Sequence, residues 1–260
     1  MPSIKPRRLE STANRRIRTL LKQVKDLKVS PDEARYVHET FDRYYTDSKS
    51  IENHNKRLRD CGLPSIDRLI ELVKKPKVNF LDVCAGKGSL GQYFRISKIG
   101  KRVAYYPVDI LESENVIRHD IVNDILPKNA FDVILAQFGF PYLTDKFKAL
   151  ENVINSLSVN GVLAIPDFGK FNINGLECDL NNTIGRNRLI LLLSSACELG
   201  GFDFKIKPEG GIIIKKLKDT DFRFNLKFIK AVPARPSKWL QNIESRKVYL
   251  NSELVSHYKI

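Results

Sequence analysis

The chain has 260 residues, and 42% of them are hydrophobic, which is enough to build the core of one large domain. Lysine and arginine number 44 against 30 aspartate and glutamate residues, so the formal net charge is +14, an excess that speeds association with anionic partners such as nucleic acid or an acidic membrane surface. The four dispersed cysteines form no C-x-x-C pair and no apolar run reaches 18 residues, so we expect no disulfide scaffold, no metal site and no membrane span.

Residues 1–77 are predicted to form a basic, helical N-terminal extension. Apolar side chains recur at helical spacing from Ile17 to Leu27, with arginine and lysine on the other face. Ser30-Pro31-Asp32-Glu33 supplies the start of a second helix, and the stretch from Pro64 to Leu72 carries another apolar stripe at helical spacing. The segment lacks the apolar stretch of a signal peptide, so we expect a cytoplasmic protein; its Arg-rich, acid-poor opening also fits an organelle transit peptide.

From residue 78 to about 218, short apolar runs alternate with segments long enough for crossover helices. The strand-like runs are VNFLDVC, RVAYYPVD, FDVILAQF and GVLAIPDF. Only four residues separate Phe202–Ile206 from Gly211–Leu217, so these two runs must pair as an antiparallel hairpin. We therefore predict an α/β fold, a doubly wound and mostly parallel sheet that ends in this hairpin, followed by a basic C-terminal extension, residues 219–260, packed on the core.

The segment from Phe80 to Gly91 is an apolar strand that breaks into a glycine-rich turn and then a helix. Gly86 and Gly88 let the backbone pass close to a ligand, and the amides of a helix N-terminus face the same place. Asp109 closes the next strand, 21 residues after Gly88, and an acid there can accept hydrogen bonds from both hydroxyls of a ribose. The pattern predicts a nucleoside-binding site.

In LDVCAGKGSLG, residues 81–91, the sequence resembles the nucleotide-binding loop of the class I, Rossmann-like S-adenosylmethionine-dependent methyltransferases. The likeness continues in the family's order through His119-Asp120-Ile121, the run at 130–138 and LENVINSLSVNG at 150–161, which looks like the helix and turn before the fifth strand. The resemblance covers residues 78 to about 218 and implies a seven-stranded sheet and S-adenosylmethionine as the cofactor. It implies that the cofactor is bound by Asp82, Ala85, Gly86, Gly88, Asp109, Ile110, Asp120, Ile121, Gln137 and Phe138.

Dinucleotide-dependent oxidoreductases are the nearest alternative, because they also need a glycine loop and a ribose acid. The letters G-x-G-x-x-G do occur at residues 86–91. The preceding Asp82-Val83-Cys84-Ala85 is nevertheless of methyltransferase type, and the antiparallel hairpin is foreign to those oxidoreductases.

Catalytic residues are hard to read from the sequence, because methyl transfer mainly requires alignment of acceptor and donor, with a base only where the acceptor must lose a proton. The Asn-Pro-Pro-Tyr type motif that the family implies for amino acceptors is absent from QFGFPY at residues 137–142. In the related ribose 2'-O-methyltransferases, which use a Lys, Asp, Lys, Glu tetrad, the Asp would fall near Gln137, and Lys56 could take the first lysine position. Asp167 and Lys170 remain the candidate catalytic residues, although a charge at the end of a strand more often simply faces solvent.

Aromatic residues surround the expected acceptor region and could stack on a planar acceptor or on adenine, or belong to the core. They are Phe138, Phe140, Tyr142 and Phe168.

These observations predict a methyltransferase that uses S-adenosylmethionine and acts on RNA or another nucleic acid, bound through the basic N-terminal and C-terminal segments. Two alternatives stay open. The chain could methylate a small molecule, for which the basic surface would be incidental, or it could be a non-catalytic protein of this fold that serves as a nucleic-acid-binding or assembly module.

Overall fold

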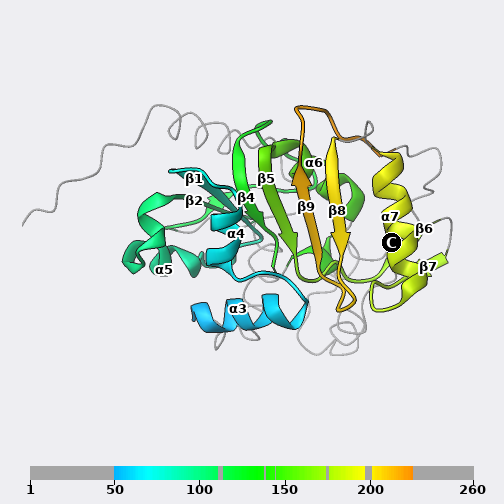
Figure 1. The fold of residues 1–260 in the computed structure, drawn as a ribbon, viewed down its shortest axis with the longest axis horizontal. Coiled ribbons are helices and arrows are strands. Elements are labelled where there is room, and N and C mark those ends of the chain that lie inside the picture. The colour runs from blue at the N-terminus through cyan, green and yellow to red at the C-terminus, as the bar shows by residue number, and fades with distance from the viewer. Residues whose placement is uncertain are drawn as a thin grey trace, which may run out of the picture.

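The computed structural model describes residues 50–110, 114–137, 139–143, 145–173, 176–196 and 201–224. Their centre is a seven-stranded sheet in the order β3-β2-β1-β4-β5-β9-β8 (Figure 1). Its strands are β1 (Val78–Val83), β2 (Val103–Asp109), β3 (Ile117–Arg118), β4 (Phe131–Leu135), β5 (Leu157–Ile165), β8 (Phe202–Ile206) and β9 (Ile212–Lys216). Neighbouring strands from β3 to β5 are parallel, whereas β9 runs antiparallel to both β5 and β8. The predicted fold class is therefore confirmed, including the terminal hairpin.

The other described elements lie around this sheet. A second, two-stranded sheet pairs β6 (Phe171–Ile173) with β7 (Leu176–Cys178), and the sequence did not predict it. The described helices are α3 (Ile51–Asp60), α4 (Ile66–Leu72), α5 (Leu90–Ile96), α6 (Lys146–Ser156), α7 (Thr183–Ser195) and the 3₁₀ turns η1 (Ile99–Arg102) and η2 (Phe140–Tyr142). The predicted helices before residue 50 lie outside the described residues.

Four of the helices begin at a side-chain cap. In each, the side-chain oxygen of the capping residue accepts the backbone N–H three positions on, which satisfies one of the otherwise unpaired donors of the first turn. The caps are Ser50 for α3, Ser65 for α4, Asp145 for α6 and Asn182 for α7.

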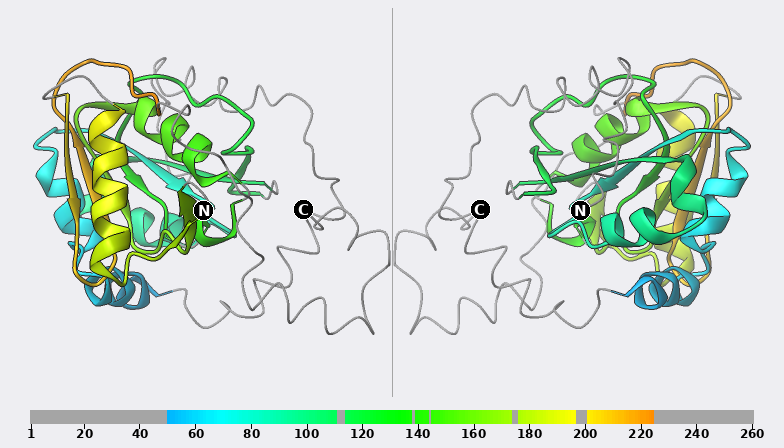
Figure 2. Two further views of the ribbon diagram at one scale, coloured as in Figure 1. Left: turned by 90° about the vertical axis from the view of Figure 1, so that its right-hand side faces the viewer. Right: turned by 90° about the vertical axis from the view of Figure 1, so that its left-hand side faces the viewer.

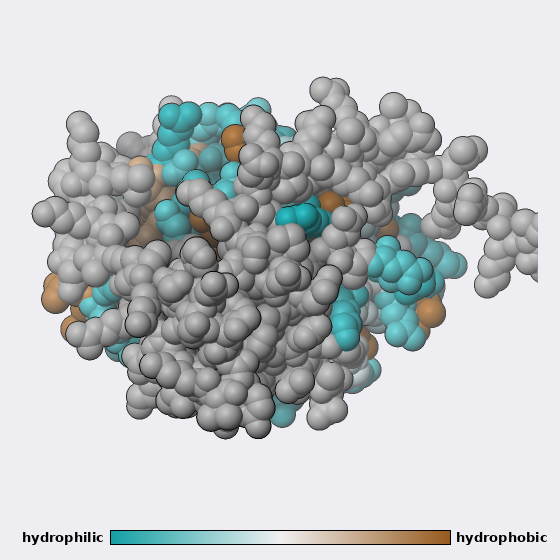
Figure 3. Space-filling model, turned by 180° about the vertical axis from the view of Figure 1, so that it is seen from behind, coloured by the Kyte–Doolittle hydropathy of each residue, from teal (hydrophilic) through white to brown (hydrophobic). Residues whose placement is uncertain are grey.

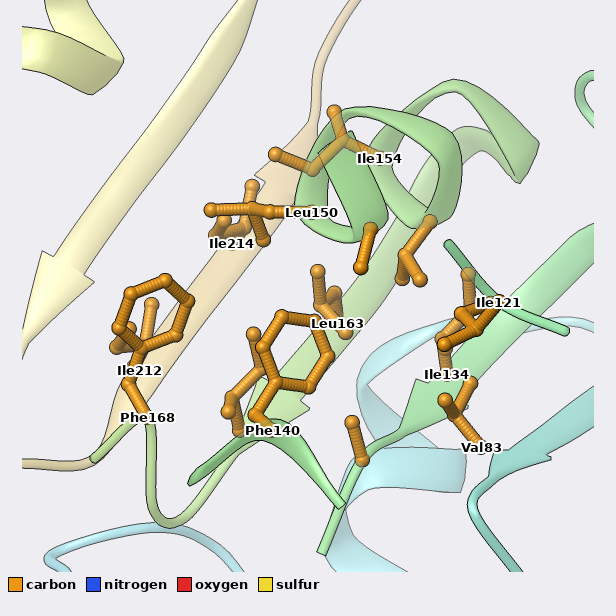
Figure 4. Packing of buried hydrophobic residues seen from close by; sticks show 14 of the residues in the cluster. Val83, Ile121, Ile134, Phe140, Leu150, Ile154, Leu163, Phe168, Ile212 and Ile214 are labelled. Atoms are coloured by element: carbon orange, nitrogen blue, oxygen red, sulfur yellow. The ribbon is translucent and has the colours of Figure 1, made fainter. Parts of the chain in front are cut away.

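Two layers of helices cover the sheet, one on each face (Figure 2). Because successive side chains of a strand point to opposite faces, Phe80 packs with α3, α4 and α5 while Leu81 packs with α6 and α7. Figure 4 shows the second of these cores, in which Leu150 and Ile154 of α6 lie over Leu163 of β5. Both faces of the parallel strands are thus buried, as a doubly wound fold requires.

Strand β5 begins at Leu157, four residues before the start that the sequence predicted at Gly161. Residues 150–161 were expected to form a helix and a turn, but α6 ends at Ser156 and the chain enters the strand directly. Leu157 is fully buried and pairs with Phe131. The register of the two strands shifts after this pair, and Asn160, which lies in the shifted part of β5, has a φ of 65°. Burial of Leu157 therefore extends the strand through residues that read locally as a turn.

The described part of the predicted N-terminal extension, residues 50–77, packs on the sheet. Leu58, Ile66 and Leu69 share a hydrophobic core with Phe80 and Val133. On the other face, beyond residue 218, Phe222 and Phe224 are buried against the core as well. The boundaries at residues 77 and 218 remain predictions. Among the described residues, none of the helices combines the length and apolar composition needed to cross a membrane.

Candidate functional site

The glycine-rich turn after β1 has the backbone that its sequence predicts. Cys84, Gly86 and Gly88 all have positive φ angles, of 57°, 57° and 67°. The N–H of Ala85 donates to the carbonyl of Val108 at 3.0 Å, so the turn is held against the end of β2. A Cβ on Gly88 would lie 3.1 Å from the side chain of Val116, so the left-handed backbone and the close neighbour both favour glycine there.

Asp109 joins the ends of three strands. Its Oδ2 accepts the N–H of Gly86 at 2.9 Å, and its carbonyl accepts the N–H of His119, just after β3, at 2.7 Å. The residue closes β2, so its carboxylate lies beside the glycine turn that follows β1. This is the place that the sequence predicted for an acid that binds ribose.

Two further carboxylates lie close to the same turn. Asp82 is buried and accepts a hydrogen bond from the Tyr105 hydroxyl at 2.6 Å; burial, with a smaller contribution from Asp109, raises its pKa to about 7. Burial and then the charges of Asp109, Asp82 and Asp120 raise the pKa of the Cys84 thiol, which is therefore protonated at neutral pH. Asp109 and Asp120, with Asp82 about half ionised at pH 7, place negative charge around this turn, which suits a cationic ligand.

Asp120 and Ile121 follow β3 at the same edge, and both are buried. The Oδ1 of Asp120 accepts the N–H of Val122 at 2.9 Å, and its Oδ2 accepts the side-chain amide of Asn123 at 2.7 Å. The carboxylate thus shapes the turn after β3. Of the other residues predicted to bind the cofactor, Ile110 is half-buried beside Asp109, and Phe138 lies outside the described residues.

Gln137, at the end of β4, is turned towards α3. Its Nε2 donates to the carbonyl of His54 at 2.9 Å, and its Oε1 accepts from the Nδ1 of the same histidine. The Nε2 of His54 then accepts from the hydroxyl of Ser89 at 2.9 Å. Because both the oxygen and the nitrogen of the Gln137 amide hydrogen-bond to His54, the side chain holds α3 over the ends of β1 and β4. These residues are 83 positions apart, and no spacing in the sequence indicates the contact.

We expect this contact to make the protein acid-sensitive. Burial, above all, lowers the pKa of His54, so below the ordinary histidine value of about 6.5 the unfolded chain binds a proton that the folded chain does not. The free energy of unfolding should therefore fall as the pH drops below that value, by at most about 1.4 kcal/mol per pH unit, until the folded histidine also titrates. Denaturant unfolding at pH 7.5, 6.5 and 5.5 measures this, with His54→Gln as a variant that cannot titrate. The same pH slope in both proteins would contradict the expectation.

The two candidate catalytic residues are placed apart from each other. Asp167, after β5, lies 3.4 Å from Arg57 of α3 and accepts the N–H of Gly169 at 2.9 Å. The ammonium of Lys170 is exposed and pairs with Glu177 of β7 at 2.6 Å. Asp167 thus stays at the edge of the sheet beside α3, whereas Lys170 is turned to the β6–β7 hairpin. Lys56, on α3, is exposed.

Lys146 is a buried cation near this region that the sequence did not reveal. It opens α6, is 6% exposed, and donates to the carbonyl of Lys170 at 2.6 Å. Burial lowers its pKa to about 8, and Asp167 opposes the shift. Its ammonium lies 6.0 Å from the centre of the Phe168 ring. Lys146 therefore holds the loop after β5 against α6.

Two of the four aromatic residues considered for stacking belong to the core. Phe140 and Phe168 stack on each other with ring centres 5.4 Å apart, and both are at most 1% exposed (Figure 4). They are covered by Ile212 and Leu163 among others, so neither presents a face to a planar ligand. Phe138 and the side chain of Tyr142 lie outside the described residues.

No family model matches the chain, and no curated protein matches it by sequence. Solved structures do resemble it. A candidate S-adenosyl-L-methionine-dependent methyltransferase of Methanococcus maripaludis is 13% identical, with 75% of this chain and 98% of that one covered and a TM-score of 0.46. Phosphoethanolamine N-methyltransferase 1 of Haemonchus contortus, bound to phosphoethanolamine and S-adenosylhomocysteine, is 14% identical over 86% and 57% of the two chains, with a TM-score of 0.39. A SAM-dependent methyltransferase of Aquifex aeolicus is 18% identical over 65% and 97%, with a TM-score of 0.36.

At such identities the likeness concerns the fold alone. The strand order of this chain, with β9 antiparallel between β5 and β8, is that of the doubly wound, mostly parallel sheet predicted from the sequence. The solved structures that resemble this chain are described as methyltransferases, in keeping with the resemblance stated for residues 78–218.

Proposed function

We propose that the chain is an S-adenosylmethionine-dependent methyltransferase. The observation that carries this proposal is the contact between the Asp109 carboxylate and the Gly86 N–H, which joins an acid at the end of β2 to the glycine turn after β1. The turn lies where the strand order reverses, between β1 and β4, and ligands of open α/β sheets bind at such a switch point, beyond the carboxyl ends of the strands.

The residues at this edge suit the positive charges of S-adenosylmethionine. The cofactor carries a positive sulfonium and an ammonium group, and Asp82, Asp109 and Asp120 supply negative charge around the turn. Asp109 would bind the ribose hydroxyls, and Asp120 and Ile121 would lie at the adenine. Asp82 and the turn at Gly86 would lie beside the amino-acid end.

The bound cofactor supplies an activated methyl group, so the chain itself has to position the acceptor and keep water out. The contacts of His54 with Gln137 and Ser89 hold α3 over the edge where this would happen. Asp167 borders the same edge and stays our candidate for a base or an acceptor ligand. Lys170, paired with Glu177, would first have to leave that partner to act.

For the acceptor we propose RNA or another nucleic acid, supported by the net charge of +14. One observation favours the non-catalytic alternative. Gln137 stands where acceptor motifs of this fold begin, yet its amide is engaged with His54. A chain of this kind could keep the fold as a binding module, and transfer of the methyl group must therefore be measured directly.

Calorimetric titration with S-adenosylmethionine and with S-adenosylhomocysteine tests the cofactor site. We expect micromolar binding of both by the wild-type protein. Asp109→Ala should weaken it at least about 100-fold, because two hydrogen bonds to a carboxylate contribute about 1.5–3 kcal/mol each. Asp203→Ala is the matched control, since Asp203 lies on β8, two strands beyond β5, and pairs with the exposed Lys205.

Absence of cofactor binding by the folded wild-type protein would contradict the proposed function. Binding that both aspartate variants retain would remove Asp109 from the site. Where binding is confirmed, transfer of a labelled methyl group to total RNA, compared with a small-molecule extract, separates the two acceptor classes. Binding without transfer to either favours the non-catalytic module.

A further inference from the structure

Two lysine-rich segments meet at the edge of the sheet opposite the cofactor edge. Residues 74–77 lead into β1 and residues 98–102 lead into β2. Val78 is paired with Val103, so the strands start side by side and the segments before them are neighbours. The side chain of Arg102 donates to the carbonyl of Lys75, which ties the two segments together.

Four of the cations in these segments point to solvent. They are Lys74, Lys77, Lys98 and Lys101, which we call the basic edge. Lys75 is different, because it is partly buried and pairs with the buried Asp132 at 2.6 Å. Within the part of the chain that the structure describes, none of the four lysines of the basic edge pairs with an acid. Their charge is therefore not neutralised by a described neighbour.

The sequence around the basic edge is free of acids. Residues 72–81 and 83–108 contain no Asp or Glu. The acids Asp82, Asp109 and Asp120 lie instead at the carboxyl ends of β1, β2 and the neighbouring β3. Strand β1 has six residues, so the two edges are separated by about 20 Å. The molecule thus has a negative edge at the glycine turn and a positive edge opposite.

We propose that the basic edge binds the phosphate backbone of a nucleic acid. This inference names a binding surface for the acceptor of the proposed function and rests on that function for the choice of partner. Lysine ammonium groups act on phosphates as point charges without reading bases, so binding here is independent of sequence. In the view from behind, the coloured atoms at the end of the molecule that carries α5 are mostly hydrophilic, with a few hydrophobic atoms among them (Figure 3).

An anionic membrane is the competing polyanion. Membrane-surface segments combine basic residues with apolar side chains that enter the bilayer. Within the described residues, the two segments of the basic edge expose no large hydrophobic side chain themselves, although Leu72, 37% exposed, and Ile96, 81% exposed, each lie two residues before one of them. This composition favours nucleic acid over a lipid surface.

The test is fluorescence anisotropy with a labelled single-stranded RNA of mixed sequence, about 30 nucleotides long, several times the site of one binding domain. The variant carries Lys74→Gln, Lys77→Gln, Lys98→Gln and Lys101→Gln. The control replaces the four lysines of the β8–β9 hairpin region, Lys205, Lys207, Lys215 and Lys218, by Gln, which removes the same charge from the opposite end of the strand order.

We expect the basic-edge variant to bind the RNA at least about 10-fold more weakly at about 0.15 M salt. Log K falls as log salt rises, and each phosphate that the variant no longer neutralises makes this dependence shallower by about 0.7. The control should stay within about twofold of the wild type. Equal weakening in both variants, or none, would overturn the proposal, as would binding of phosphatidylserine vesicles in place of RNA. Pairwise variants at residues 74 and 77, and at 98 and 101, serve if the quadruple variant does not fold.

Calorimetry with S-adenosylmethionine keeps the two proposals apart. The basic-edge variant should bind the cofactor as the wild type does, since its lysines lie at the opposite edge from Asp109. RNA binding that depends on the basic edge without cofactor binding would leave this inference standing and remove the proposed function. Cofactor binding, together with an RNA affinity that the variant does not change, would support the proposed function and overturn this inference.

Discussion

Gly139→Ala is expected to damage the proposed cofactor site although Gly139 itself carries no chemistry. A Cβ at this position would lie 2.0 Å from the Sγ and 2.3 Å from the Cβ of Cys84. The Cβ of Cys84 is fixed by the backbone, so a rotamer change cannot relieve the second contact and the glycine turn must shift. Overpacking of this kind typically costs about 1–3 kcal/mol, which corresponds to a loss of cofactor affinity of about 5- to 150-fold if the turn bears the whole cost.

A second substitution makes this expectation specific. Cys84→Gly removes both clashing atoms, and glycine readily adopts the φ of 57° that residue 84 has. Cys84→Gly alone should bind the cofactor like the wild type, and the double variant should recover most of the affinity that Gly139→Ala removes. Calorimetric titration of the four proteins gives the complete cycle. A double variant as weak as Gly139→Ala would show that the clash with Cys84 is not the cause.

Binding of S-adenosylmethionine should release protons from Asp82. The pKa of this buried carboxyl is about 7, so at pH 7 about half of the molecules carry the proton. A cation bound beside Asp82 favours the carboxylate and lowers its pKa, so up to about half a proton per site should leave. Binding enthalpies measured at pH 7 in buffers of different ionisation enthalpy count these protons.

Two controls identify the source of the protons. S-adenosylhomocysteine lacks the sulfonium charge and should release fewer. Asp82→Asn keeps an acceptor for the Tyr105 hydroxyl but cannot titrate, so it should release almost none. Because the folded pKa of Asp82 is raised, the carboxyl destabilises the wild-type fold progressively as the pH rises from about 4 through 7, and the variant should lack this trend in unfolding experiments. Equal proton release in wild type and variant would assign it to another group.

The fold was predictable because its determinants are local. Strand and helix periods alternate along residues 78–218, and the four residues between Ile206 and Gly211 permit only a hairpin. The pairing of Asp109 with the glycine turn also followed from local order, since neighbouring parallel strands end at one edge. The start of β5 was placed too late, because burial of Leu157 overrides residues that read as a turn.

The contacts that close the site were not predictable. His54 meets Gln137 across 83 residues, and the ammonium of Lys146 meets the carbonyl of Lys170 across 24. Neither pair has a period or a motif, because each contact is fixed by how α3 and α6 pack on the sheet. The same reason explains Phe140 and Phe168, whose spacing fits a stacking surface equally well but whose rings are buried together.

The antiparallel position of β9 also has a consequence for the order in which the chain can fold. Strand β5 ends at Ile165, but its neighbour β9 starts only at Ile212, so one long side of β5 has no partner in the sheet until the chain has been made to about residue 216. Closing such a loop costs entropy before any stabilising interaction forms. During synthesis, β1, β2 and β4 can pair early, while the side of β5 that later pairs with β9 stays exposed. Formation of the last hairpin is thus expected to be the step that protects this side of β5 from aggregation.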